Sequence, residues 1–221
     1  MPESRSSSPD RQWFRKTTWT EADEQEFHAR LQRARSSYNK AQYLRIQAHH
    51  LQHDASPPQF EAAQALLELL VAQYPEPSEL GAAYLQLAQC REALGRTDEA
   101  VEAMRRAVEF STTESGARNT DAASHFALLV ARLGLRDHYD AALQLFTPQD
   151  VTLILPPVQA RMHAAMALMA ADTGRAEAAS HARQALDLLA SSPPHEVDDA
   201  LRARLQALAA QPRKSRWKFW G

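Results

Sequence analysis

The chain is poor in cysteine and in glycine. Its single cysteine, Cys90, excludes an internal disulfide and a cysteine-based zinc cluster, and its apolar surroundings favour a buried thiol. The six glycines form neither a phosphate-binding loop nor the Gly-x-Ser-x-Gly turn of hydrolases. We therefore expect no catalytic residue, no metal site and no cofactor, and no small-molecule substrate.

Long apolar runs and an excess of one charge are also missing. No run approaches the roughly 18 apolar residues that a membrane helix needs, and the first residues lack the apolar core of a signal peptide. These features predict a cytoplasmic protein. The formal net charge of −2 gives no overall attraction to nucleic acid or to an anionic membrane.

The chain does contain three similar turns. At Gly95, Gly134 and Gly174 an apolar segment stops, and an Ala-rich segment starts within a few residues. The intervals between these glycines are 39 and 40 residues. Such a period is typical of stacked helical hairpins, each of which buries its apolar face against its neighbours. Proteins of this kind usually bind other chains.

Apolar periodicity predicts helices along most of the chain. Thr20 is the expected N-cap of one long helix, whose apolar stripe runs from Phe27 to Ala48 and which ends near His53. Ser78 is the expected cap of a later helix. The other helices are expected at about 59–74, 78–94, 97–111, 120–133, 137–146, 158–190 (a hairpin) and 196–210. Strand signals are nearly absent, so the predicted fold class is all-α.

The segment from Tyr84 to Ala107 resembles a tetratricopeptide repeat. That family places large and small residues in a fixed order on two helices, and here those positions hold Tyr84, Leu87, Ala88, Ala100, Met104 and Ala107. The likeness extends more loosely over residues 43–190. It implies antiparallel hairpins stacked as a right-handed solenoid. The long N-terminal helix would precede this array, and a capping helix would follow it at the C-terminal end. We expect this domain at 18–210, between a disordered basic aromatic tail at 1–17 and a basic aromatic tail at 211–221.

The resemblance also implies a concave groove that holds a peptide or a partner helix. Its lining would be Leu85, Gln89, Glu92, Phe126, Val130, Arg161 and Leu168. Such a surface has few charges and suits an amphipathic or hydrophobic ligand. The alternative is that Phe126, Val130 and Leu168 pack against neighbouring helices.

Aromatic residues among cations near both ends are a second candidate site. They are Trp13 and Phe14 near one end, and Arg216, Trp217, Phe219 and Trp220 near the other. This pattern suits an anionic membrane surface, a single-stranded nucleic acid or an acidic partner. It suits equally well the docking of each tail onto the chain's own helices.

His49 and His53 have the four-residue spacing of metal ligands on a helix, but only Asp54 offers a third ligand, so we expect solvated histidines. The favoured hypothesis is a protein-protein interaction adaptor that binds its partner in the groove. The alternative is a peripheral module that binds anionic membrane or nucleic acid through its tails. The long N-terminal helix could pair two protomers into a homodimer.

Overall fold

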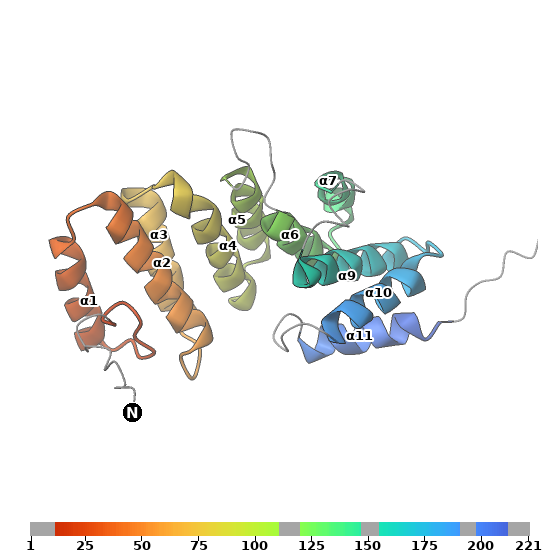
Figure 1. Cartoon of the computed structure of the whole chain (residues 1–221), viewed down its shortest axis with the longest axis horizontal. Coiled ribbons are helices and arrows are strands. Elements are labelled where there is room, and N and C mark those ends of the chain that lie inside the picture. The colour runs from red at the N-terminus through yellow and green to blue at the C-terminus, as the bar shows by residue number, and fades with distance from the viewer. Residues whose placement is uncertain (1–11, 111–119, 147–154, 191–197, 212–221) are drawn as a thin grey trace, which may run out of the picture. The chain divides into compact units, whose positions relative to one another are not determined.

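The computed structural model describes residues 12–110, 120–146, 155–190 and 198–211. Every regular element in these ranges is a helix, so the predicted all-α class is confirmed. The chain divides into two compact units, Met1–Ala117 and Arg118–Gly221, where the sequence predicts one repeat domain. Figure 1 colours the first unit red to yellow-green and the second green to blue.

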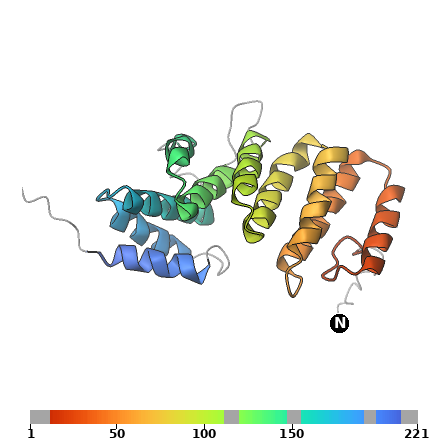
Figure 2. The same ribbon diagram turned by 180° about the vertical axis from the view of Figure 1, so that it is seen from behind.

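The first unit is a row of helices connected by short turns. They are α1 (Glu21–Arg33), α2 (Ser37–His53), α3 (Phe60–Gln73), α4 (Pro77–Ala93) and α5 (Thr97–Phe110). From α2 onward, each helix packs against the next one in the chain, and α2 also contacts α4 (Figures 1 and 2). The core between them is built of leucine and alanine, with Leu67 and Leu70 of α3 fully buried.

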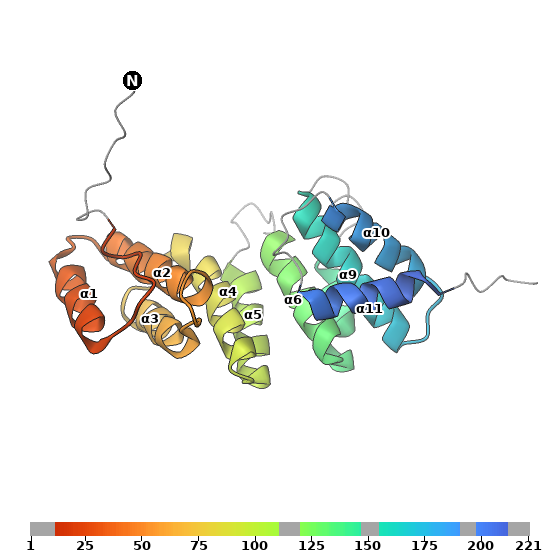
Figure 3. The same ribbon diagram turned by 90° about the horizontal axis from the view of Figure 1, so that it is seen from below.

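The second unit is built around one alanine-rich helix. Its elements are α6 (Thr120–Leu133), the 3-10 turn η2 (Arg136–His138), α7 (Tyr139–Gln144), α9 (Pro156–Asp172), α10 (Ala178–Ala190) and α11 (Asp199–Ala209). Helix α9 packs against both α6 and α10, and α11 packs against α10 and contacts α9 (Figure 3). Fully buried alanines at 160, 164 and 167 allow the neighbouring helices to approach α9 closely.

The three glycine turns form as the sequence predicts. Gly95, Gly134 and Gly174 have φ angles of +73°, +67° and +69° and follow the ends of α4, α6 and α9. This left-handed conformation is costly for residues that carry a Cβ atom and is the usual way in which a helix ends at glycine.

The prediction of one long N-terminal helix is wrong, because the helix is interrupted between α1 and α2. Ala34 and Ser36 are both extended, and the Ser36 hydroxyl accepts a hydrogen bond from the Asn39 backbone N–H at 3.1 Å, which caps a new helix. The apolar stripe read across this break includes Tyr38, whose side chain is 44% exposed. The apolar stripe that the sequence suggests therefore consists of residues from two different helices, although their spacing fits a single one.

Two predicted helix starts have different outcomes. Thr20 is confirmed as the N-cap of α1, where it forms a reciprocal capping box with Asp23. Ser78 is not a cap: α4 begins at Pro77, and Glu76 precedes it without a side-chain hydrogen bond. Proline suits the first helical position because its φ is preset and its missing N–H has no partner to lose there.

Candidate functional site

The residues predicted to line a groove differ in exposure. Leu85, Gln89 and Glu92 lie on one face of α4 and are half-buried. The other four belong to the second unit and are buried, with exposed fractions of 4% for Phe126, 0% for Val130, 5% for Arg161 and 0% for Leu168. These four side chains have almost no surface to offer a partner, and for Phe126, Val130 and Leu168 this burial agrees with the packing alternative.

Arg161 joins α9 to α6. Its Nε donates a hydrogen bond to the Ser124 hydroxyl at 3.0 Å, and its guanidinium pairs with Asp121. Burial, with the Arg161 charge as the second cause, lowers the pKa of the neighbouring His125 to about 4. Arg161 is therefore a buried structural cation, and His125 is neutral at physiological pH.

The N-terminal aromatic residues pack onto α1 and α2. We call residues 12–20 the clasp. The Trp13 ring lies 5.2 Å from Phe27 and 5.0 Å from Tyr43 between centroids, and Phe14 stacks on Tyr43 at 4.6 Å. The expected tail at 1–17 therefore differs from the structure over its last residues, because apolar rings gain more by packing on α1 and α2 than by facing water.

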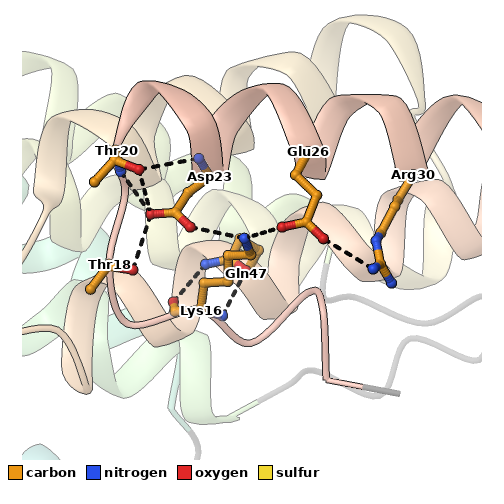
Figure 4. Close-up of polar contacts among 7 residues, drawn as sticks. All are labelled: Lys16, Thr18, Thr20, Asp23, Glu26, Arg30 and Gln47. Carbon is orange, nitrogen blue, oxygen red and sulfur yellow. Dashed lines mark hydrogen bonds and ion pairs between the residues drawn. The ribbon is translucent and has the colours of Figure 1, made fainter. Parts of the chain in front are cut away.

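Polar contacts hold the clasp at Lys16 (Figure 4). The Lys16 ammonium lies 2.8 Å from Asp23 and 2.5 Å from Glu26. The buried Gln47 amide accepts a hydrogen bond from the Lys16 N–H at 2.9 Å and donates one to the Lys16 carbonyl at 2.7 Å. Lys16 therefore ties the clasp to α1 through its side chain and to α2 through its backbone.

The clasp should loosen in acid. The hydrogen bond from Lys16 lowers the pKa of Asp23 and of Glu26 below their ordinary values of about 4. A carboxyl whose pKa is lowered by folding stabilises the fold above its unfolded pKa, and this contribution is lost as the pH falls towards the folded pKa. In a variant with Trp217→Phe and Trp220→Phe, the emission of the remaining tryptophans should shift to longer wavelength below about pH 4.

Lys16→Gln is the control for this titration, since it removes the ammonium and keeps a polar side chain of similar length. Its tryptophan emission should already be shifted at neutral pH and should change less in acid. An identical acid transition in both proteins would contradict a role of Lys16 in the clasp.

The remaining candidates are the C-terminal aromatic residues and the histidine pair of α2. Arg216, Trp217, Phe219 and Trp220 lie outside the described residues. The rings of His49 and His53 lie 4.6 Å apart between centroids, and partial desolvation lowers the pKa of both. No group of three or more potential metal ligands exists in the part of the chain that the structure describes. None of the described helices has both the length and the apolar character required to cross a membrane.

The second unit has an open cavity of about 250 Å³, which we call the turn cavity. It is lined by Arg136, Tyr139, Asp140, Leu143, Met166, Met169, Ala170, Thr173, Arg175, Glu177 and His181. Methionine and leucine form its apolar part, and charged residues surround them. Its residues come from separate helices, so no local sequence pattern points to it.

The wall of the turn cavity is fixed by Asp172 at the end of α9. Arg136 binds this carboxylate through two nitrogens at 2.7 and 2.8 Å, and the Tyr139 hydroxyl donates to it at 3.2 Å. The hydrogen bond from Arg136 lowers the pKa of Asp172. On the α10 side, His181 stacks on His163 with 3.1 Å between their Nδ1 atoms. These contacts fix the side chains that line the cavity on both sides.

No family model, no curated protein and no solved structure matches this chain.

Proposed function

We propose that this chain is a helical adaptor, which binds a segment of another protein and performs no chemistry of its own. The observation that carries the proposal is the turn cavity. Its volume of about 250 Å³ suits one large apolar side chain of a partner, and Met166 and Met169 offer an adaptable apolar surface. The charged rim would contact the partner's backbone and polar side chains, as in most protein-binding sites.

We further propose that the protein acts in the cytoplasm and that its hairpins stack as tetratricopeptide repeats do. The close packing of α4 on α5 supports the proposed stacking. Leu87 and Met104 are buried, and Ala88, Ala100 and Ala107 are fully buried, which is the pattern of large and small residues that lets two helices pack closely. The half-buried stripe of Leu85, Gln89 and Glu92 is the part of the predicted groove that a partner could still reach.

Filling the turn cavity should weaken partner binding. Ala170 lines the cavity and is 5% exposed, so Ala170→Leu places a larger side chain in its apolar part. Ala141→Leu is the matched control, because Ala141 is exposed on α7 and does not line the cavity. Both proteins should keep the wild-type circular dichroism.

The measurement is affinity capture from the native cell, followed by titration of the purified partner. We expect the Ala141→Leu variant to retain the partner and the Ala170→Leu variant to lose at least about tenfold in affinity, the loss expected when a buried anchor side chain is excluded. Equal binding by both variants would remove the cavity from the proposal. No partner for the wild-type protein would overturn the adaptor function.

A further inference from the structure

The break between α1 and α2 opens a second pocket, which we call the corner pocket. It is a wide-open hollow with a volume of about 560 Å³. It is lined by Trp13, Arg30, Arg33, Ala34, Arg35, Asn39 and Tyr43. All of these residues belong to the first unit, and the pocket does not depend on the turn cavity.

The lining of the corner pocket contains three arginines and no carboxylate. Arg30 pairs with Glu26 at 3.0 Å, and the exposed Arg33 donates from Nε to the Ala29 carbonyl at 3.3 Å. Arg35 is exposed and makes no hydrogen bond or ion pair among the described residues. Like charges gathered in a hollow repel one another and focus a positive potential that an anion relieves.

This positive charge is local. From Phe27 to His53 the sequence has five lysines and arginines and no aspartate or glutamate. That stretch therefore carries a formal charge of +5, while the whole chain carries −2 and the rest of it −7. A long polyanion such as nucleic acid would meet repulsion beyond the pocket, whereas a short anionic segment would not.

The aromatic walls of the pocket are held in place by the clasp. Trp13 and Tyr43 contact each other with 5.0 Å between centroids, and Lys16 anchors the clasp nearby. Guanidinium groups bind carboxylates through paired hydrogen bonds, and half-buried rings accept apolar side chains. The pocket thus offers contacts for both charged and apolar side chains.

We propose that the corner pocket binds a short acidic segment of a partner protein, in which aspartate or glutamate residues alternate with apolar residues. The carboxylates pair with Arg33 and Arg35, and an apolar side chain packs on Trp13 and Tyr43. This inference deepens the adaptor proposal by naming the chemistry of a partner. It shares with that proposal only the premise that the chain binds proteins.

The test is direct titration of the full chain with a labelled peptide that repeats Asp-Glu-Leu, read out by fluorescence anisotropy. The matching Asn-Gln-Leu peptide is the ligand control. We expect saturable binding of the acidic peptide at low ionic strength, weakened by salt, and no binding of the neutral one. Failure of the acidic peptide to bind at low salt would overturn the inference and leave the turn cavity untouched.

Paired variants locate the site. Arg33→Glu with Arg35→Glu should reduce the affinity by at least about tenfold, because two charge-assisted hydrogen-bond donors become carboxylates. Arg105→Glu with Arg106→Glu makes the same change in charge on two exposed arginines of α5 and should alter the affinity by less than about twofold. Equal losses in both would show attraction to net charge alone and would overturn the site.

Two further arms separate the acidic segment from other anions. Arg33→Gln with Arg35→Gln, a milder change that keeps polar side chains, should also weaken binding while the circular dichroism stays unchanged. A single-stranded oligonucleotide and phosphatidylserine vesicles should bind more weakly than the peptide. Tighter binding of either one, lost in the Arg33 and Arg35 variants, would assign the pocket to that ligand and contradict an acidic protein segment.

Discussion

Leu168→Ala is expected to lower the free energy of unfolding of the second unit by about 3 kcal/mol. Leu168 is fully buried on α9, which packs against both α6 and α10. Truncation removes the transfer free energy of the lost carbons and leaves a cavity that the surrounding helices fill only in part. A lining residue of an open groove would give a much smaller change, so this measurement distinguishes the two roles considered for Leu168.

Amide hydrogen exchange read out by mass spectrometry is the suitable measurement, because a chain of two units need not unfold in one transition. Exchange should accelerate in peptides from α6, α9 and α10. Leu133→Ala is the matched control: the same change at a side chain that is 39% exposed should cost less than about 1 kcal/mol. Similar effects of both substitutions would mean that Leu168 is not a core residue in solution.

Phe27→Ala is expected to destabilise the first unit by about 4 kcal/mol and to release the clasp. Phe27 is fully buried, and its ring lies 5.2 Å from Trp13 and 5.4 Å from Trp19 between centroids. Removing it leaves a cavity and takes away the surface on which both indoles rest. The corner pocket would lose its Trp13 wall in the same step.

Chemical denaturation reports the stability, and the emission of Trp13 and Trp19 in the Trp217→Phe, Trp220→Phe background reports the clasp. Both signals should change together. Phe110→Ala is the control in the same unit, because it removes an identical side chain that is 43% exposed and should leave the tryptophan emission unchanged. A stable protein with unshifted emission after Phe27→Ala would contradict the packing of the clasp.

The helix ends that the sequence predicts correctly are those marked by local chemistry. Gly95, Gly134 and Gly174 take left-handed backbone angles, and Thr20 caps α1 through Asp23 only three residues away. Such signals act within one turn of the chain, so they hold in almost any tertiary context. The break between α1 and α2 also has a local signal, the cap formed by Ser36 and Asn39, but the uninterrupted apolar spacing concealed it.

The candidate sites depend on contacts between distant residues. The apolar stripe of α9 reads equally well as a groove or as a core, and only the presence of α6 and α10 on either side decides that Leu168 is buried. Likewise, the sequence shows Lys16 only as one cation of a tail, and the fold brings it into contact with Gln47 and Asp23. The corner pocket did have a sequence signal: the absence of any acidic residue between Phe27 and His53.

The sequence by itself therefore determined the all-α class, the glycine turns and the capped start of α1, because backbone preferences and capping act between near neighbours. The tertiary structure decided which apolar stripes are core, that the clasp packs on α1 and α2, and where the turn cavity and the corner pocket open. Burial is a property of the surfaces that meet, and residues far apart in a chain meet only after it folds.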